Sequence, residues 1–452
     1  MLKNLFATFK EQHLHGEDLS DKRVEALLDF SAQVLYEVLR RHLGFDKAFQ
    51  SALHSPKAVA TKHVPLRMLY KVSRSVVSDY YLLRYAENYI YGRRGGSARR
   101  LVRLWLLLRA NEEFFGALWD PVRRYRKKLL KSLPRKIESI DELMENIEDP
   151  IERLAVELSY PRWFVETLVN KLGIEEAREL LEELNEEKWW IRVNTLKADI
   201  DEIAEKLYEK GVVVRRDKDL EYMLEVVHYS EPLHHLDEMW RGEIVFQDKA
   251  SAMVVEALQP SENDRILDLT AAPGIKASLV MQLTKNRARL VLVDVSWERV
   301  RRMVRLLRLY GVDMSRVEIV VADSREWRPR TTFDKTLLDA PCTSSGTIGK
   351  DPAVKIHLED KSWVTRFPQL QRDLLRAALL ADTNTIVYAT CSLLPSEGEE
   401  HFKGLEHMLQ EPPIPGSPGY PNYTISRLVR RFFPHKHSTQ GFFIASLAKN
   451  TS

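Results

Sequence analysis

The stretch RILDLTAAPGIKAS, residues 265–278, decides the fold of this chain. It reads as a short apolar strand that ends at an aspartate, a turn with proline and glycine, and the start of a helix. Four further apolar runs follow it, with helical segments such as 296–312 between them. Strands that alternate with helices predict a parallel sheet with crossover helices. The further runs are RLVLVDV (289–295), VEIVVAD (317–323), KTLLDA (335–340) and TIVYAT (385–390).

Polar residues stand where these strands end, and ligands of open parallel sheets bind outside the carboxyl ends of the strands. One aspartate after a strand is often a helix cap or a turn former, but four in succession are harder to explain in that way. Carboxylates in a row suit hydroxyl and amino groups, and the turn has neither a G-x-G-x-x-G fingerprint nor a phosphate loop. A nucleoside such as S-adenosylmethionine fits, with Asp294 at its ribose and Asp323 at its adenine. The residues at the strand ends are Asp268, Asp294, Asp323, Asp339 and Cys391.

Cys342 and Cys391 are the only two cysteines, and each closes a strand segment. Their separation fits neither a disulfide scaffold nor a zinc site, which needs about four ligands at close spacing, so no metal is expected. Hydrophobic content of 44% and charged content of 29% are typical of a globular protein. No apolar stretch of membrane length stands out, and the start of the chain lacks the core of a signal peptide. A cytoplasmic protein and a monomer are the default expectations.

The rest of the chain predicts two further domains. Residues 1–136 read as an all-helical domain, residues 150–245 as a small α+β module, and residues 246–452 as the domain with the parallel sheet. Between Lys57 and Lys136, 20 Lys and Arg stand against five Asp and Glu, although the whole chain carries only +3. A segregated basic segment indicates a polyanionic partner, most often nucleic acid, although a solvated helical surface explains the charge about as well.

Several ordered stretches resemble the motifs of the Nol/Nop/Sun family of RNA cytosine-5 methyltransferases. The likeness covers roughly residues 150–447, and the helical front resembles, more weakly, the NusB-like domain of the family's Sun/Fmu, RsmB-like branch. The resemblance implies a Rossmann-like domain that depends on S-adenosylmethionine. It also implies an RNA substrate, rRNA before tRNA, with a single-stranded or flipped-out cytosine. The stretches are SYPRW, IRVNTLK, FQDKASAMVVEAL, ILDLTAAPGIKA, LVDVSWERV, TLLDAPCTSSGTIGKDP, IVYATCSLLPSEGEE and RFFPHKHSTQGFFIA.

The resemblance also implies a role for each motif residue. The cysteine of the TCS motif, here Cys391, attacks carbon 6 of cytosine, and the cysteine of the APC motif, here Cys342, assists release of the product. Asp339 is implied to contact ring nitrogen 3 and the amino group of the cofactor, and Lys276 to support base and ligand. Asp294 would hold the ribose and Asp323 the adenine. The loop around the amino-acid portion of the cofactor would consist of Thr270, Ala271, Ala272, Pro273, Gly274, Ile275 and Lys276.

The chain departs from the family pattern at three positions. Thr270 and Ile275 replace a cysteine and a glycine of the loop C-A-A-P-G-G-K, and Gly398 replaces an asparagine. Thr270 is expected to be harmless, and Gly398 to affect loop stiffness. Ile275 is expected to weaken cofactor binding or to shift the loop if its position needs a positive φ or close ligand approach.

The alternative hypothesis is therefore a catalytically silent RNA-binding relative of the family. Two other enzyme classes fit less well. A nicotinamide-dependent oxidoreductase would need the missing glycine fingerprint. A cysteine hydrolase would need a histidine base, for which His357 or His401 could be proposed, although neither belongs to a motif.

Overall fold

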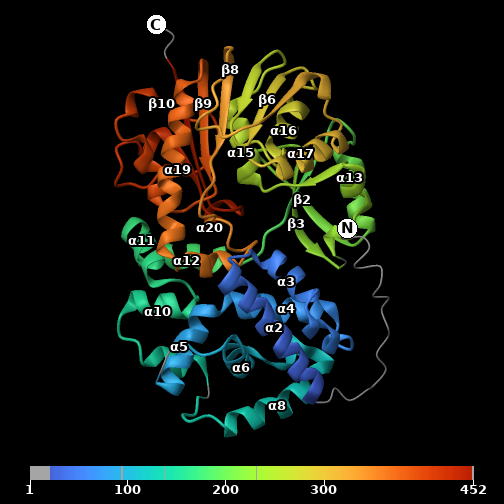
Figure 1. The fold of residues 1–452 in the computed structure, drawn as a ribbon, viewed down its shortest axis with the longest axis vertical. Helices are drawn as coiled ribbons and strands as arrows, with labels where there is room; N and C mark the ends of the chain where they lie inside the picture. Colours follow the sequence, from blue (N-terminus) through green and yellow to red (C-terminus); the bar gives the residue numbers. More distant parts are fainter. Residues whose placement is uncertain (1–20, 93–94, 138, 231, 450–452) are drawn as a thin grey trace. The chain divides into compact units, whose positions relative to one another are not determined.

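The computed structural model describes residues 21–449, except 93, 94, 138 and 231. The chain divides into two compact units, Met1–Ser159 and Tyr160–Ser452 (Figure 1). The expectation about a signal peptide concerns residues that lie outside the described part of the chain.

Where the structure describes the first unit, its regular secondary structure is helical and contains no strand, as the periodicity predicts. The apolar run over 64–92 is broken at Asp79, whose carboxylate accepts a hydrogen bond of 3.0 Å from Arg109. In α6, Trp105 is buried completely, while Arg99 and Arg103 on another face pair with acidic residues of α2. The helices are α2 (Asp21–Arg41), α3 (Phe45–Leu53), α4 (Leu66–Ser78), α5 (Tyr80–Tyr91), α6 (Ala98–Arg109), α7 (Glu112–Phe115), α8 (Trp119–Lys131), α9 (Ile140–Glu145) and α10 (Pro150–Glu157).

The second unit opens with α11 (Arg162–Leu172), α12 (Ile174–Leu184) and a small antiparallel sheet. The strands of that sheet lie in the order β2-β3-β1-β4. Its strands and helices are β1 (Trp190–Val193), α13 (Ile200–Glu209), β2 (Val212–Arg216), β3 (Met223–Tyr229), α14 (Asp237–Arg241) and β4 (Ile244–Phe246). These elements confirm the α+β character that the sequence predicts for this stretch.

The large sheet has the strand order β10-β12-β9-β8-β5-β6-β7, with β11 paired to β12. Strands β5 to β9 run parallel, and β12 joins β9 antiparallel. The chain builds outward from β5 in one direction and then returns to its other side with β8, so the strand order reverses between β5 and β8. Such a reversal is where ligands bind in open α/β sheets. The strands are β5 (Arg265–Asp268), β6 (Arg289–Asp294), β7 (Val317–Val321), β8 (Phe333–Asp339), β9 (Thr383–Thr390), β10 (Leu409–Gln410), β11 (Val429–Phe432) and β12 (Phe442–Ala448).

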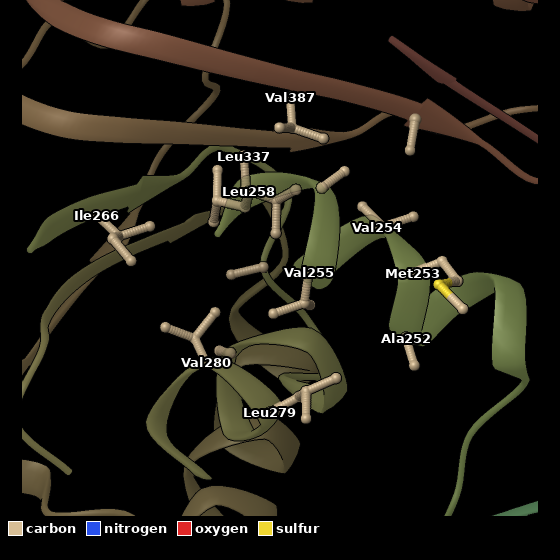
Figure 2. Packing of buried hydrophobic residues seen from close by; sticks show 14 of the residues in the cluster. Ala252, Met253, Val254, Val255, Leu258, Ile266, Leu279, Val280, Leu337 and Val387 are labelled. Atoms are coloured by element: carbon tan, nitrogen blue, oxygen red, sulfur yellow. The ribbon is translucent and has the colours of Figure 1, made fainter. Parts of the chain in front are cut away.

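Helices cover both faces of this sheet, because successive side chains of a strand point to opposite faces. On one face, Leu337 and Val387 pack with residues of α15 (Lys249–Leu258) and α16 (Ile275–Leu283) (Figure 2). On the other face, the next residues, Leu338 and Tyr388, pack with α19 (Lys361–Leu380). The remaining helices of the unit are α17 (Trp297–Leu309), α18 (Ala353–His357) and α20 (Pro434–His437). This architecture confirms the predicted Rossmann-like α/β fold.

Across the residues that are described, no helix combines the length and the apolar character needed to cross a membrane.

Candidate active site

The two cysteines meet at the carboxyl ends of neighbouring strands. Asp339, the last residue of β8, pairs in register with Ala389 of β9. Cys342 follows Asp339 by three residues, and Cys391 follows Ala389 by two. The sulfur atoms of Cys342 and Cys391 lie 2.9 Å apart, and both thiols are free and half-buried. Parallel pairing of β8 and β9 therefore brings together two residues that are 49 positions apart.

The two thiols have different surroundings. The hydrogen bond to Cys391 is the main cause that raises the pKa of Cys342 well above its usual value, with burial and the nearby Glu397 carboxylate adding to it. The hydrogen-bonded pair of thiols consequently keeps at least one proton at neutral pH. Cys391 lies 3.6 Å from the hydroxyl of Ser344, which has left-handed backbone at φ +60°.

An ion pair joins the segment after β5 to the end of β8, the two strands between which the strand order reverses. The ammonium group of Lys276, in the first turn of α16, lies 2.5 Å from the carboxylate of Asp339 at the end of β8. The hydroxyl of Thr270 donates a hydrogen bond of 2.9 Å to the backbone carbonyl of Asp339. The loop after β5 and the end of β8 are thus fastened to each other beside the cysteines.

The loop over 270–276 is held by neighbouring strand ends. The amide of Thr270 donates to Asp268 at 3.0 Å, and the amide of Ala272 donates to Asp294 at 3.2 Å. Burial raises the pKa of Asp268 to about 7. The loop contains one left-handed residue, Gly274 at φ +93°, where a β-carbon would come within 2.8 Å of Met303.

Ile275 is not the residue that needs a positive φ. It is the first residue of α16 and is absent from the left-handed positions, which in this loop are confined to Gly274. A positive φ, one of the two conditions under which Ile275 was expected to be costly, is therefore not required of it, because the preceding glycine makes the turn. The expected effect on cofactor affinity stays a prediction.

Two arginines pair with the aspartates that were expected to hold a nucleoside. Asp294 is buried and forms an ion pair of 3.3 Å with Arg299 of α17. Asp323, after β7, is held by Arg325 at 2.6 Å, and these hydrogen bonds lower the pKa of Asp323. The backbone amide next to Asp323, that of Ala322, donates to the carbonyl of Asp294, so the ends of β6 and β7 are adjacent.

The structure therefore gathers the predicted residues at one edge of the sheet. Carboxylates stand at the ends of β6 and β8 and shortly after β7, and the loop before α16 lies among them. This acidic set fits a ligand that offers hydroxyl and amino groups, such as S-adenosylmethionine. Within the described part of the chain, no three His, Cys, Asp or Glu side chains are arranged to hold a metal ion.

Arg192 and Glu397 belong to the site, but sequence reasoning did not single them out. The buried guanidinium of Arg192, in β1, donates 2.7 Å to Ser278 and 3.4 Å to the carbonyl of Ile275, and burial lowers its pKa to about 10. Glu397 is buried beside the cysteine loops, and its carboxylate accepts from Thr343 and Ser392. Both residues lie in stretches quoted as family motifs, which was the available signal.

The histidines that a hydrolase would use serve other purposes. His401 is buried and lies 2.8 Å from the side-chain oxygen of Gln371, and burial lowers its pKa to about 4. His357 packs against Trp363, with ring centroids 5.6 Å apart.

Gly398 stands in a crowded place. A β-carbon there would lie 2.8 Å from Arg431 and 2.9 Å from the ring of Phe443. Arg431 and Phe443 therefore leave no room for a side chain at position 398. The expected effect of Gly398 on loop stiffness stays a prediction.

Comparisons with known proteins agree with this geometry. Residues 255–448 match the family described as 16S rRNA methyltransferase RsmB/F, and residues 160–229 match the ferredoxin-like domain of RsmF/B-like methyltransferases. The chain is 30% identical over 313 residues to a probable ribosomal RNA small subunit methyltransferase B of Bacillus subtilis, covering 67% of this chain and 69% of the relative. It is 33% identical over 318 residues to a 28S rRNA (cytosine(4447)-C(5))-methyltransferase of Homo sapiens, covering 66% of this chain and only 38% of that protein.

Two crystal structures are similar as well. PH0851 matches with a TM-score of 0.72 and 26% identity, over 96% of this chain and 100% of that one. NSun6 from Pyrococcus horikoshii with SFG matches with a TM-score of 0.58 and 25% identity, over 65% of this chain and 99% of that one.

Proposed function

Because the chain belongs to the RsmB/F family of rRNA methyltransferases, we propose that it methylates carbon 5 of a cytosine in ribosomal RNA with S-adenosylmethionine as the donor. The observation that carries the proposal is the contact of 2.9 Å between Cys342 and Cys391 beside the Lys276–Asp339 pair. Two thiols at one point of the sheet match a reaction in which one sulfur attacks and another helps it to leave.

Carbon 5 of cytosine is too weak a nucleophile to take a methyl group unaided. The thiolate of Cys391 adds to carbon 6, and the electron pair of the ring double bond moves toward carbon 5, which then accepts the methyl group. Once Cys391 is bonded to carbon 6, the hydrogen bond that raises the pKa of Cys342 is lost, so Cys342 can give its own proton to solvent. Its thiolate then takes the hydrogen on carbon 5 as a proton, and the electron pair left behind restores the ring double bond and expels the sulfur of Cys391. This proton transfer is how Cys342 assists release, while Cys391 is the nucleophile, as the position of each cysteine in its motif implies.

The methyl donor fits the acidic edge of the sheet. Bound S-adenosylmethionine would supply an electrophilic methyl group, and its sulfur would keep the electron pair of the broken bond and leave as a neutral thioether. Asp294 would hold its ribose, Asp323 its adenine and Asp339 its amino group, while the backbone of residues 270–276 would surround its amino-acid portion. Lys276 would keep Asp339 in place and orient the base through it, which the distance of 2.5 Å supports.

RNA recognition is proposed for residues 1–136 and for the α+β module 150–245, which precede the catalytic domain 246–452 in the sequence. The basic excess between Lys57 and Lys136 supports contacts with phosphates. The target cytosine must leave any base stack to reach Cys391. Transfer RNA is the alternative substrate, and we expect the protein to act as a monomer.

The test is to incubate the Cys342→Ala variant with total RNA and S-adenosylmethionine and to run the mixture on a denaturing gel. A covalent protein–RNA band should accumulate, because the attacking sulfur cannot be released. Adding Cys391→Ala to the same variant should abolish the band. Sequencing of the trapped RNA then distinguishes ribosomal from transfer RNA.

If the band fails to form and the unmutated protein neither binds S-adenosylmethionine nor methylates RNA, the proposal is overturned. The catalytically silent RNA-binding relative would then be the better description of the chain.

A further inference from the structure

Glu397 lies between the two loops that carry the cysteines. It ends the short 3₁₀ turn Pro395–Glu397 that follows β9, and its side chain is completely buried. Burial of a carboxylate is costly unless hydrogen bonds satisfy it. The partners of Glu397 therefore indicate why the chain keeps an acidic residue here.

The partners of this carboxylate are the residues directly after the two cysteines. One oxygen accepts from the amide of Thr343 at 2.9 Å, and the other accepts from the hydroxyls of Thr343 and Ser392, both at 2.5 Å. Thr343 follows Cys342 and Ser392 follows Cys391. A single side chain thus joins the two loops one residue away from each sulfur.

All four partners of the carboxylate donate hydrogen bonds. The fourth is the amide nitrogen of Gln371 in α19, at 3.0 Å, which also donates to the carbonyl of Pro341, the residue before Cys342. A carboxylate accepts at both oxygens and therefore satisfies every one of these donors.

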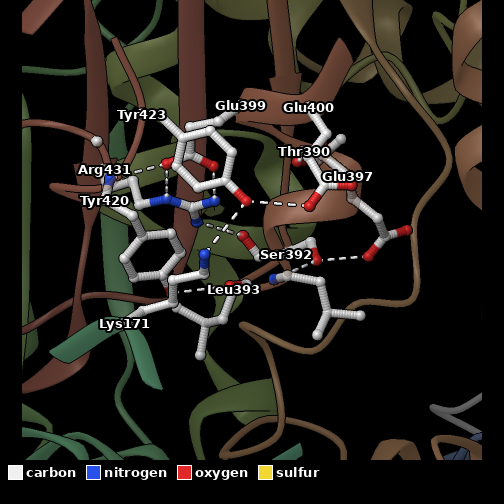
Figure 3. Close-up of polar contacts among 12 residues, drawn as sticks. Lys171, Thr390, Ser392, Leu393, Glu397, Glu399, Glu400, Tyr420, Tyr423 and Arg431 are labelled. Atoms are coloured by element: carbon white, nitrogen blue, oxygen red, sulfur yellow. Dashed lines mark hydrogen bonds and ion pairs between the residues drawn. The ribbon is translucent and has the colours of Figure 1, made fainter. Parts of the chain in front are cut away.

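The position of Glu397 is itself fixed by buried contacts (Figure 3). Its backbone carbonyl accepts from the hydroxyls of Tyr388 and Thr390, both at 3.1 Å. The neighbouring loop is held from its other side, because the fully buried Arg431 donates to the carbonyl of Ser392 at 3.1 Å and pairs with Glu399 at 2.6 Å. Buried hydrogen bonds therefore fix both the backbone that carries the Glu397 carboxylate and the neighbouring loop.

We propose that Glu397 is a positioning residue, which holds Cys342 and Cys391 at the mutual distance that attack and release require. The inference rests on the proposed methyltransferase function. Glu397 acts through Thr343 and Ser392 and touches neither sulfur in the hydrogen-bond network. Its negative charge adds a second effect, because it favours the protonated thiol of Cys342.

The experiment separates the reach of the side chain from its charge. Glu397→Gln keeps the length, and its amide nitrogen can donate to the hydroxyls of Thr343 and Ser392, which can turn to accept. Glu397→Asp keeps the charge but is one methylene shorter, so it cannot reach both loops. Glu400→Gln, at an exposed residue three positions further on, is the matched control.

Methyl transfer to RNA is measured as kcat and as KM for S-adenosylmethionine. Misplacement of a reacting group by about 1 Å can cost roughly 100-fold in rate. We therefore expect Glu397→Asp to lower kcat by roughly 10- to 100-fold with little change in KM, and Glu397→Gln to retain most of the kcat. Iodoacetamide alkylation of Cys342 in the Cys391→Ala background should show a lower pKa when Glu397→Gln is added.

If the Asp variant is as active as the Gln variant or more so, or if neither differs from the parent, the inference is overturned. A parent protein without methyl-transfer activity, whose Cys342→Ala variant forms no covalent band, would instead overturn the proposed function, so the two failures are distinguishable.

Discussion

Lys276 reaches across the point where the strand order reverses and binds Asp339 at 2.5 Å. A second Lys–Asp pair, Lys335 with Asp264 at 2.8 Å, joins the opposite ends of the same two strands, β5 and β8. The two pairs have the same chemistry and comparable burial. Only the first lies at the carboxyl ends, where ligands bind.

The likeness of the two Lys–Asp pairs gives a prediction in which the second pair is the control. Lys276→Met leaves Asp339 without its cation, and loss of a charged hydrogen bond costs about 1.5–3 kcal/mol, or roughly 10- to 150-fold in affinity or rate. We expect kcat/KM for methyl transfer to fall by that factor. Lys335→Met should leave kcat/KM within about threefold of the parent, because it changes stability alone. Equal losses in both variants would contradict the role of Lys276.

Restoring the family residue at Gly398 is expected to harm this protein. An asparagine there would press its β-carbon against Arg431 and Phe443, and overpacking typically costs about 1–3 kcal/mol. Gly398→Asn should therefore lower the free energy of unfolding in urea titrations and reduce methyl transfer. Gly404→Asn is a comparison for backbone strain alone, since its β-carbon would meet open space while its backbone is left-handed at φ +85°, so Gly398→Asn should cost more. A Gly398→Asn protein as stable as the parent would show that Arg431 can move.

The buried Asp268 predicts a pH dependence of stability. Its pKa is about 7 in the folded protein, against about 3.9 in an unfolded chain. Between these values the folded state holds a proton that the unfolded state has lost, so this residue makes stability fall as the pH rises from about 4 to about 7.

Asp268→Asn removes this loss and keeps an oxygen for the amide of Thr270. From pH 5 to pH 8 the variant should gain up to roughly 2–3 kcal/mol relative to the parent in urea unfolding. Asp382→Asn, at an exposed position, should show no such trend. A stability difference that is the same at both pH values would rule out titration of Asp268 in this range.

Contacts of the helical unit with RNA predict a salt dependence. Each phosphate contact to single-stranded nucleic acid contributes about −0.7 to the slope of log K against log salt. Replacing the exposed Lys127 and Lys131 of α8 with Gln should weaken RNA binding and reduce that slope by roughly 1–2 in filter-binding titrations.

The rate at saturating RNA should not change in this double variant. Lys403→Gln is the control, because this exposed residue lies in the catalytic domain, outside both segments proposed to bind RNA. An unaltered salt slope in the double variant would remove α8 from the RNA surface.

The sheet could be predicted because its strands are continuous apolar runs with a carboxylate or cysteine at the end. The comparisons confirm the resemblance to the Nol/Nop/Sun family, which those motifs carried. The strands β10 and β11 escaped prediction. β10 has two residues, and β11, VRRF, contains Arg431, which is buried only because Glu399 pairs with it. That ion pair joins residues far apart in the sequence, so no local sequence pattern predicts that Arg431 is buried.

The site could also be predicted only in part. Motifs located the cysteines and aspartates, but the network around Glu397 joins it to Thr343 across 54 positions. The turn before α16 shows a second limit of prediction from the sequence. Which of two adjacent residues takes the left-handed backbone depends on the helix start, and Gly274 takes it here.

The distance between the two thiols has a consequence for regiochemistry. Sulfur atoms 2.9 Å apart can serve only neighbouring atoms of one substrate. Carbons 5 and 6 of a pyrimidine are such neighbours, whereas a ribose hydroxyl lies well away from the bond between them. In the proposed reaction, a base bonded to Cys391 at carbon 6 would present carbon 5 to Cys342, so the pairing of two strands would select the position that is modified.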